Sequence, residues 1–372
     1  MKVKKYFLLV FSIFLTFNIA FAQETCPLIG AIRWDAWHGK KGNVGVYVEK
    51  VLSNKNWHYR LPFCATINND GKVEIDCVNE NVISKEADYA KAHGINFWAF
   101  LAYEPDSAMS LGLKIFTTSK QNYNFALIIE FSRYNSFNFR ERNRYLVSLI
   151  KHKNYLLINN RPVIFIFNIN DEELKRNWKN ENGFRIVIED LITKLKDEGI
   201  NKPYFVIMDF QYKNACYWAN IFDFDAISTY ATHPNKPGSY DDLVNHALSW
   251  WESAKTMCKN KTVVPIVMTG WDPRPRAETP APWQKEEYIK KASEIYFETP
   301  KPEEIADAVG RAVVWAKQNK SPLIIIYAWN EFDEGGWIMP TLMKGDARLK
   351  AIGELIKRLC NEKNSNNSHR SP

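Results

Sequence analysis

The sequence predicts an α/β protein of the (β/α)8 TIM-barrel class, built as a single domain with loop insertions. Eight short apolar runs occur along the chain, and most are followed by a segment with helical periodicity. Alternating strands and helices predict a parallel sheet, and strands apolar at nearly every position are typical of a sheet covered on both faces. Eight such units favour a closed barrel. The absence of a Gly-x-Gly-x-x-Gly pattern after the first run argues against a Rossmann fold.

The predicted strands follow one another at regular intervals, and they span Leu28–Trp37, Ile95–Tyr103, Phe125–Phe131, Pro162–Asn168, Tyr204–Phe210, Asp225–Tyr230, Val263–Trp271 and Pro322–Trp329. Helical periodicity predicts helices at Asn79–His93, Arg140–Lys153, Arg185–Glu198, Tyr240–Lys259, Pro302–Lys317 and Asp346–Leu359. Two segments interrupt this alternation, a hairpin from Cys64 to Cys77 and a charged stretch from Asn170 to Gly183. Both are interpreted as loop elaborations of the barrel.

The first 22 residues have the features of a secretory signal peptide. Three lysines precede an apolar run from Phe7 to Phe17, and small residues at Ala20 and Ala22 predict cleavage before Gln23. The run is shorter than the roughly 20 residues of a membrane span, which argues against an uncleaved anchor. We therefore expect a secreted or periplasmic protein without a membrane span, with a barrel domain at residues 23–360 and a polar, disordered tail at residues 361–372.

The charge balance argues against a nucleic-acid partner. The chain carries a formal charge of +7, and loss of the three leader lysines leaves +4 without long basic blocks. The cysteines lack the paired spacing of a zinc site, and no cofactor motif is present. We expect a monomer that needs neither a metal ion nor a cofactor.

Six cysteines remain after the predicted cleavage, and export makes disulfides chemically possible. Asp70-Gly71 is a strong signal for a two-residue type I′ hairpin turn, and with that turn Cys64 faces Cys77. Such a non-hydrogen-bonded pair brings the two Cα atoms to about 4.5 Å, which a disulfide accommodates. The sequence leaves open how the other four cysteines pair: Cys26, Cys216, Cys258 and Cys360.

The residues that end the apolar runs are candidates for the functional site, because barrel enzymes build their sites at the carboxyl ends of the strands. These positions are rich in carboxylates, tryptophan and tyrosine, which suits sugars that stack on flat rings and donate hydrogen bonds to carboxylates. The same residues also serve as core packing or as ion-pair partners in many proteins. The candidates for substrate binding are Trp34, Asp35, Tyr103, Glu104, Tyr230, Trp271, Asn330 and Trp337.

Glu331 and Glu334 are the candidates for catalysis. They lie three residues apart directly after the eighth predicted strand, so a helical turn would place them side by side, with Cβ atoms about 5 to 6 Å apart. Two nearby carboxyl groups separate their proton affinities, and glycoside hydrolysis requires one proton donor and one ionised partner. The alternative interpretation is a solvated acidic turn, but Trp329 and Trp337 bracket the pair, and solvated turns are seldom so aromatic.

The stretch Trp329-Asn330-Glu331-Phe332-Asp333-Glu334-Gly335 resembles the Asn-Glu-Trp-x-Glu-Gly motif of glycoside hydrolase family 99 and of its relatives in polysaccharide-biosynthesis clusters. The segments at Ile29–Ala31 and Ala90–Phe100 agree with this family, as do those at Asn160–Val163 and Gly345–Ile352. The resemblance implies a retaining endo-α-1,2-mannosidase. In that mechanism Glu331 is the base at the sugar 2-hydroxyl, and Glu334 is the acid and then the base at the glycosidic oxygen.

Two departures from the family pattern bear on the substrate. Phe332 stands where the family has Trp, and Met339-Pro340 stands where relatives carry Glu-Pro. The sequence hypothesis is therefore a secreted, endo-acting, retaining glycoside hydrolase for α-linked oligosaccharides or polysaccharides, without a commitment to mannan. Two alternatives remain open at this point: a non-catalytic glycan-binding barrel and a glycan-assembly protein.

Overall fold

The computed structural model describes residues 26–167, 169, 171–178 and 181–361. The predicted signal peptide lies outside the described residues, as does the predicted tail beyond its first residue. Within the described residues no helix is both long enough and apolar enough to cross a membrane.

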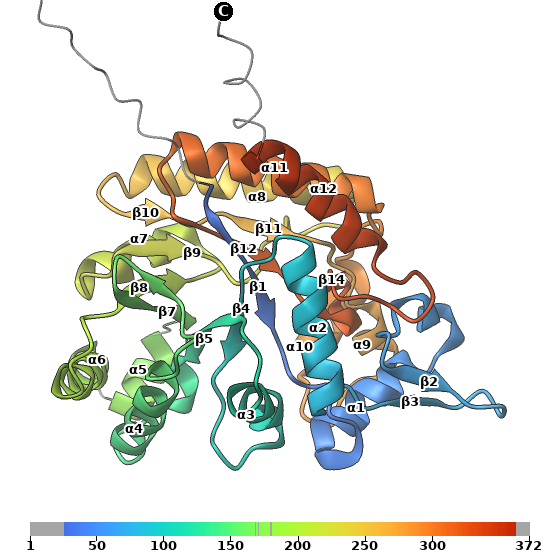
Figure 1. The fold of residues 1–372 in the computed structure, drawn as a ribbon, viewed down its shortest axis with the longest axis horizontal. Helices are drawn as coiled ribbons and strands as arrows, with labels where there is room; N and C mark the ends of the chain where they lie inside the picture. The colour runs from blue at the N-terminus through green and yellow to red at the C-terminus, as the bar shows by residue number, and fades with distance from the viewer. Residues whose placement is uncertain (1–25, 168, 170, 179–180, 362–372) are drawn as a thin grey trace, which may run out of the picture.

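Eight strand positions form a parallel barrel (Figure 1): β1 (Leu28–Arg33), β4 (Phe97–Leu101), β5 (Asn124–Glu130), β7 (Arg161–Phe167), β8 (Tyr204–Met208), β9 (Ala226–Ser228), β10 with β11 (Thr262–Val263 and Ile266–Met268) and β12 (Leu323–Tyr327). All neighbouring pairs are parallel, and β1 pairs with both β4 and β12. The seventh position is split because Pro265 has no N–H to donate, so β10 pairs with β9 and β11 with β12. Since each predicted apolar run contains one of these strands, the predicted (β/α)8 barrel is confirmed.

The barrel strands are apolar because both of their faces are covered. Every residue of β8, β9 and β12 is buried. One face of each strand points into the barrel interior, and the surrounding helices cover the other; Figure 1 shows α8, α11 and α12 above the strands and α3 and α4 below them. The helices span α1 (Asn43–Leu52), α2 (Glu80–Ala92), α3 (Leu111–Thr118), α4 (Phe139–Ile150), α5 (Asp171–Trp178), α6 (Glu181–Asp197), α7 (Tyr212–Ile221), α8 (Tyr240–Met257), α9 (Arg274–Glu278), α10 (Glu286–Glu294), α11 (Pro302–Gln318) and α12 (Ala347–Asn361).

All six predicted helices are present, but the interpretation of residues 170–183 as a charged loop is wrong. That stretch contains α5 and the start of α6. The reason is an apolar stripe at helical spacing: Leu174 is buried, and Trp178 packs on Phe131 and Phe139 with ring centroids 6.4 and 5.7 Å away. Glu172, Lys175 and Arg176 are exposed.

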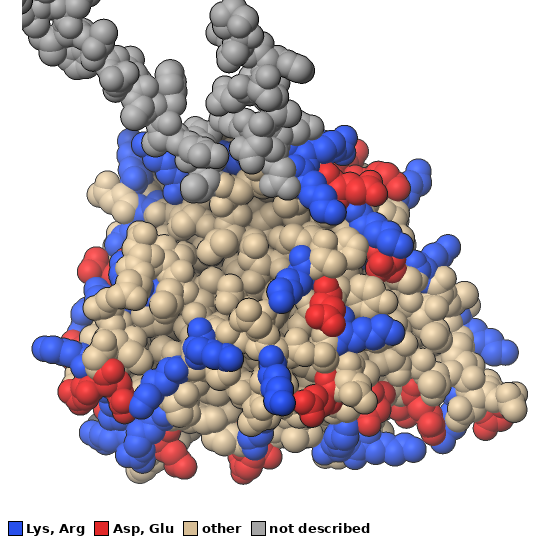
Figure 2. Space-filling model, viewed as in Figure 1, with Lys and Arg blue, Asp and Glu red and all other residues tan. Residues whose placement is uncertain are grey.

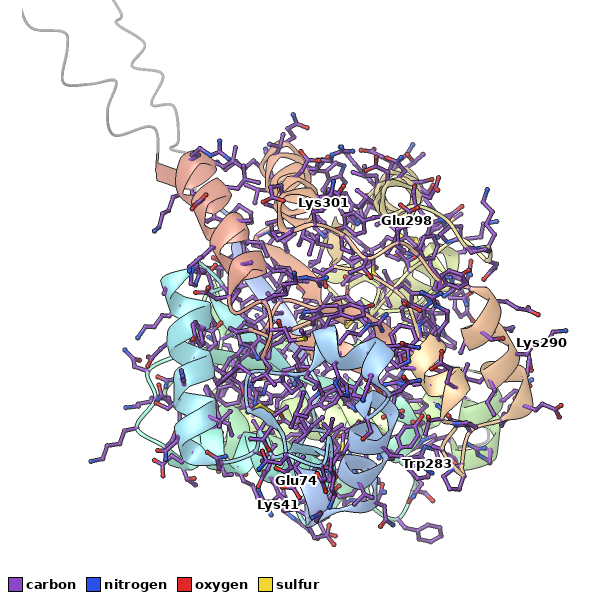
Figure 3. All side chains as sticks on the ribbon, turned by 90° about the vertical axis from the view of Figure 1, so that its right-hand side faces the viewer. Lys41, Glu74, Trp283, Lys290, Glu298 and Lys301 are labelled. Carbon is purple, nitrogen blue, oxygen red and sulfur yellow. A yellow bond between two sulfur atoms is a disulfide. The ribbon has the colours of Figure 1, made fainter. Side chains whose placement is uncertain are left out.

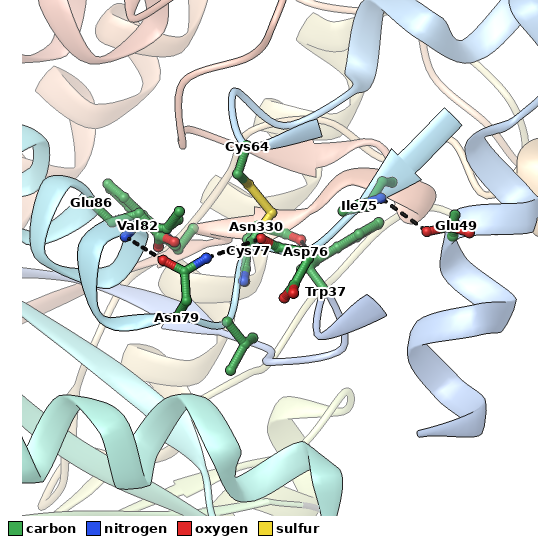
Figure 4. Close-up of a disulfide and its surroundings, with 12 residues drawn as sticks. Trp37, Glu49, Cys64, Ile75, Asp76, Cys77, Asn79, Val82, Glu86 and Asn330 are labelled. Carbon is green, nitrogen blue, oxygen red and sulfur yellow. Dashed lines mark hydrogen bonds between the residues drawn. A yellow bond between two sulfur atoms is a disulfide. The ribbon is translucent and has the colours of Figure 1, made fainter. Parts of the chain in front are cut away.

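The predicted disulfide between Cys64 and Cys77 is present, with Cα atoms 5.4 Å apart (Figure 4). The predicted register of its hairpin is wrong by one residue, since β2 (Ala65–Ile67) pairs with β3 (Val73–Ile75) so that Ala65 faces Ile75. The turn contains three residues rather than two: Gly71 adopts a φ of 80°, and the N–H of Asn68 donates to the carbonyl of Lys72. A three-residue loop with a glycine in the left-handed backbone conformation is another common connection in β-hairpins.

Two further disulfides connect distant parts of the chain. Cys26, just before β1, pairs with Cys360 near the end of α12, with Cα atoms 5.7 Å apart. Cys216 on α7 pairs with Cys258 at the end of α8, also at 5.7 Å. Charged side chains of both signs are interspersed over the face drawn in Figure 2, and no broad basic area is visible on it.

Candidate active site

Glu331 and Glu334 lie on a short turn that follows the last barrel strand. β13 (Asn330–Glu331) pairs antiparallel with β14 (Gly336–Trp337), and the single 3-10 turn η5 (Phe332–Glu334) connects them. β12 runs into this turn through buried Ala328 and Trp329, so the turn sits at the carboxyl end of the barrel. The predicted turn is therefore present, and both glutamates are directed at the same side chain, Arg276.

Glu331 is the more enclosed of the two carboxyl groups. It is 3% exposed, and its Oε1 accepts a hydrogen bond from the hydroxyl of Tyr230 at 2.8 Å. Its Oε2 is buried without a hydrogen-bond partner among the described residues, and Nη2 of Arg276 is 3.6 Å away. Burial, followed by the negative charge of Glu334, raises the pKa of Glu331 well above the usual value for glutamate. The neutral, protonated form of Glu331 is thus favoured.

Glu334 receives donors on both oxygens. Nη1 of Arg276 and the hydroxyl of Tyr288, 3.2 Å away, approach Oε1, while the hydroxyl of Tyr327 donates to Oε2. A third carboxylate, Asp333, is fully buried and accepts from Nε of Arg276 at 2.7 Å. These donors fix the positions of both carboxyl groups. Glu331 and Glu334 therefore stand in chemically different surroundings although they are three residues apart.

The loop after β11 positions Arg276 beside the two glutamates. The N–H of Asp272 donates to the carbonyl of Glu334 at 2.6 Å, and the Asp272 carboxylate binds Arg60 and Arg274, so the loop is fixed to the turn. Pro273 caps α9, and Arg276 lies on this helix. Burial alone would lower the pKa of Arg276, but the charges of Asp333 and Glu334 raise it above its ordinary value. The guanidinium therefore remains a cation between three carboxyl groups.

A second contact holds the segment that follows α9. Tyr47 on α1 donates to Oε1 of Gln284 at 3.2 Å, and its ring packs edge-on against Trp283 at 5.3 Å. Figure 3 shows Trp283 beside the ribbon of α9 and α10. Because α10 carries Tyr288, this anchorage also positions a donor to Glu334.

Four of the predicted substrate-binding residues surround the two glutamates. Tyr230 contacts Glu331 directly, and Nε1 of Trp34 donates to the hydroxyl of Tyr103 at 2.9 Å. Burial raises the pKa of Tyr103 far above its usual range, with a smaller contribution from Glu331. Trp271 packs against Tyr327 with ring centroids 5.8 Å apart, and Arg276 lies 5.1 Å from the Trp34 ring. The mouth of the barrel is thus walled by aromatic rings.

Two predicted site residues belong instead to ion pairs. Asp35 is 4% exposed, and it accepts from Nε of Arg33 at 2.8 Å; Arg33 also binds the buried Glu86. Glu104 pairs with Arg142 and lies 3.5 Å from Arg133. Buried or crowded carboxylates require a counter-charge, which these arginines supply. Their prediction as substrate ligands has no support in this geometry.

Asn330 and Trp337 hold the framework of the turn rather than facing its open side. The side chain of Asn330 accepts from the N–H of Trp34 and donates to its carbonyl, both at 2.8 Å, and so ties the turn to the end of β1. Trp337 is 4% exposed and lies under the guanidinium of Arg348 at 3.6 Å. Both side chains are already occupied by protein contacts.

The sequence interpretation did not select Asp333, Arg276, Tyr288 or Tyr327 for the site. Tyr327 ends the eighth apolar run, so its position was a usable signal. Arg276 lies in the segment that follows the seventh apolar run, so its position was a usable signal as well. Tyr288 lies on α10, a helix that the sequence analysis did not predict. Among the described residues no group of three or more histidine, cysteine, aspartate or glutamate side chains is arranged to hold a metal ion.

Fold and site together define a (β/α)8-barrel protein with a carboxylate cluster and aromatic walls at the carboxyl end of its strands. A model of the family described as "Glycosyltransferase WbsX" matches residues 117–352, which include Glu331, Glu334 and Arg276, and the chain belongs to this family. A search of curated proteins finds no significant match.

The barrel is similar to that of a solved enzyme, the GH99 endo-α-mannosidase of Bacteroides thetaiotaomicron. Its complex with bis-tris-propane has a TM-score of 0.57 at 15% identity, covering 91% of this chain and 98% of that chain. A second structure of the enzyme has a TM-score of 0.52 at 13% identity with the same coverage. At this identity the likeness establishes the shared fold.

Proposed function

We propose that this protein is a glycoside hydrolase that cleaves α-linked glycans with Glu331 and Glu334. The observation that carries the proposal is the convergence of these two carboxyl groups on one guanidinium at an aromatic-walled barrel mouth. Glycosidic cleavage needs a proton donor and a second carboxyl group close together, and burial favours the protonated form of Glu331. Similarity to the barrel of an endo-α-mannosidase supports the same class of reaction.

Within this proposal, Glu331 is the proton donor and Glu334 is the second catalytic carboxyl group. Burial favours the neutral form of Glu331, whereas Glu334 accepts from Arg276, Tyr288 and Tyr327. The resemblance to family 99 implies the opposite division, with Glu331 as the base and Glu334 as the acid. For that division Arg276 would have to leave Glu334 when a glycan binds. Endo action and retention of configuration are carried over from the resemblance as parts of the proposal.

Leaving-group dependence distinguishes the two divisions. Replacing the proton donor, as in Glu331→Gln, should lower turnover of an unactivated α-oligosaccharide by about 10²- to 10⁴-fold. It should largely spare an aryl glycoside whose phenolate leaves without protonation. Glu334→Gln should lower turnover of both substrates. The matched control is Glu287→Gln, which alters an exposed carboxylate beside Tyr288 and should change neither rate.

The opposite pattern, with Glu334→Gln rescued by the aryl leaving group, would assign the acid to Glu334 as the resemblance implies. Wild-type rates in both variants would exclude hydrolysis by this pair and leave a glycan-binding barrel. NMR of the first product anomer tests retention, and the sizes of the first products test endo action.

The family description favours a second candidate, glycosyl transfer during glycan assembly. The difference lies in the acceptor, which is water in hydrolysis and a sugar hydroxyl in transfer. Incubation of the protein with an α-glycan should release a new reducing end whether or not an acceptor sugar is added. If products form only with an acceptor sugar or a nucleotide-sugar donor, the protein is a transferase.

We also propose that the protein is exported to the periplasm or beyond the cell and acts as a monomer. The lysine-rich, apolar leader supports export, and the three disulfides are compatible with an oxidising compartment. Mass spectrometry of the mature protein should find Gln23 at the N-terminus, and a retained leader would contradict cleavage. Sedimentation should give the mass of one chain.

A further inference from the structure

A cavity of about 570 Å³ opens beside the carboxylate cluster. It lies between the loops that follow β8, β9 and β11, with helices α8 and α10 as its side walls. Trp271 and Tyr288 belong to both sites: Trp271 packs on Tyr327, and Tyr288 contacts Glu334. A glycan bound at the carboxylates would therefore extend into this cavity. Its volume falls in the range of about 300 to 1,000 Å³ typical of small-molecule sites.

One stripe of α8 faces the cavity instead of the barrel. His246, Ser249, Trp250 and Ser253 occupy positions i, i+3, i+4 and i+7, which share one face of a helix. Nothing in the described part of the chain forms a hydrogen bond with the side chains of His246, Ser249 or Ser253. Three unused polar groups thus point into the cavity from one helix.

The aromatic walls of the cavity are held in place by their own contacts. Trp271 stacks on His233 with ring centroids 4.8 Å apart, and Nδ1 of His233 contacts the carbonyl of Pro234 at 3.0 Å. Nε1 of Trp250 donates to the carbonyl of Phe210 at 3.1 Å. Fixed rings of this kind offer flat, apolar surfaces without an ordering cost when a sugar binds.

The polar lining has an unusual composition for a sugar site. No carboxylate lies among the described residues that line the cavity, so the strongest acceptors for sugar hydroxyls are missing. The charged lining residue is Lys291, which is 64% exposed and already bonded to Glu287 at 2.8 Å. The acceptors that line it are neutral, among them the side-chain amides of Gln211 and Asn235. A fully hydroxylated hexose would therefore find no charged acceptor, and an acidic sugar would find no free lysine.

We propose that this cavity is a subsite for an N-acetylated sugar unit adjoining the bond that is cleaved. An acetamido group presents a carbonyl that accepts from Ser249, Ser253 or His246, and a methyl group that packs against Trp250 and the apolar side of α10. Binding of an acetamido group requires neither a carboxylate nor a cation. The inference rests on the proposed function for its place next to the reacting bond, but binding in the cavity is measurable without turnover.

The test compares the binding of matched methyl glycosides to the mature protein. N-acetylglucosamine, N-acetylgalactosamine and N-acetylmannosamine are each paired with glucose, galactose or mannose, and glucuronic acid is added as the acidic probe. Saturation-transfer NMR and quenching of tryptophan fluorescence report binding. At least one acetamido sugar should bind about tenfold more tightly than its hydroxyl partner and than glucuronic acid, with saturation transfer strongest at the acetyl methyl group.

Ser253→Trp fills the cavity, and it should weaken binding of the preferred acetamido sugar by at least about tenfold. The matched control is Thr256→Trp, which adds the same side chain at an exposed position of α8 outside the cavity and should bind like the wild type. Equal binding of acetamido and hydroxyl sugars, or unchanged binding in Ser253→Trp, would overturn the subsite. If turnover survives Glu331→Gln and Glu334→Gln while acetamido selectivity persists, the proposed function fails and the binding site stands.

Discussion

At the scale of single residues, Arg276 determines the character of the site. One guanidinium contacts Asp333 and Glu334 and lies 3.6 Å from Glu331. Its planar fork reaches several carboxylates at once, which the ammonium group of a lysine does not do. Its positive charge also lowers the pKa of Glu331 against the opposing effects of burial and Glu334. Arg276 is thus a positioning residue that acts through both candidate catalytic groups.

Replacement of Arg276 should shift the pH dependence of turnover. If Glu331 acts in its protonated form, the basic limb of the pH profile reports its ionisation, and kcat/KM falls as the pH rises through the pKa of Glu331. Arg276→Met removes a positive charge, raises that pKa further and should move the basic limb to higher pH while lowering kcat. A pH profile of kcat/KM measures the shift.

The control for this prediction is Arg274→Met in the same loop. Arg274 pairs with Asp272 and stacks on Tyr296 at 3.8 Å, so its loss should leave the basic limb unmoved. Arg276→Lys keeps the charge and should restore the position of the limb even where kcat stays low. A basic limb that moves to lower pH in Arg276→Met would contradict a protonated Glu331.

Strand alternation explains which predicted site residues reach the carboxylates. Trp34 and Asp35 are neighbours, and successive side chains of an extended segment point to opposite sides. Trp34 lies beside Tyr103 and Arg276, whereas Asp35 turns into the buried pair with Arg33. The sequence locates the end of the strand but does not state which of two adjacent side chains faces the barrel mouth.

At the scale of elements, the site depends on the docking of two loops. The N–H of Asp272 reaches the carbonyl of Glu334 only because Gly335 follows with a φ of 84° and no side chain. A Cβ at Gly335 would lie 2.6 Å from the nitrogen of Asp272. A glycine is required here for both its conformation and its size.

Gly335→Ala should therefore separate Asp272 from Glu334, displace Arg276 and reduce turnover by at least about tenfold. The matched control is Gly71→Ala in the β2–β3 hairpin, where φ is 80° and no atom lies within 4 Å of the added Cβ. Both variants should lose about 1 to 2 kcal/mol of unfolding free energy from the left-handed backbone. Only Gly335→Ala should lose activity. Equal activities, measured beside urea unfolding curves, would contradict the role of this docking.

The helices and strands differ in how well the sequence predicts them. The eight strands were predictable because burial on both faces makes each one continuously apolar. The hairpin register was not, because Asp70-Gly71 is compatible with both a two-residue and a three-residue turn, and the structure adopts the latter. Helix α5 was hidden by its charges, since its apolar stripe consists of only a few residues.

At the scale of the whole molecule, the disulfides differ in the length of chain that they close. Cys26–Cys360 spans 334 residues, Cys216–Cys258 spans 42 and Cys64–Cys77 spans 13. In the chain-entropy model these loops correspond to about 6, 4 and 3 kcal/mol of stabilisation. Removal of the first pair, as Cys26→Ser with Cys360→Ser, should lower the unfolding midpoint most.

The same double substitution at Cys64 and Cys77 is the comparison, measured in urea without reductant. A larger loss from the hairpin pair would show that local packing outweighs loop closure. Turnover of the Cys26 and Cys360 variant should match the wild type in the absence of urea, because this disulfide lies at the amino end of β1, away from the carboxylates.

The sequence by itself determined the barrel and the stretch that carries Glu331 and Glu334, because strand burial and the turn after the last strand are local properties. Only the tertiary structure decided what surrounds those two groups. Arg276 is separated from them by 55 and 58 residues, Tyr230 by about a hundred, and both approach from other loops. The protonation of a carboxyl group depends on its burial and on the charges that the fold brings close to it. The residues next to it in the sequence determine neither of these.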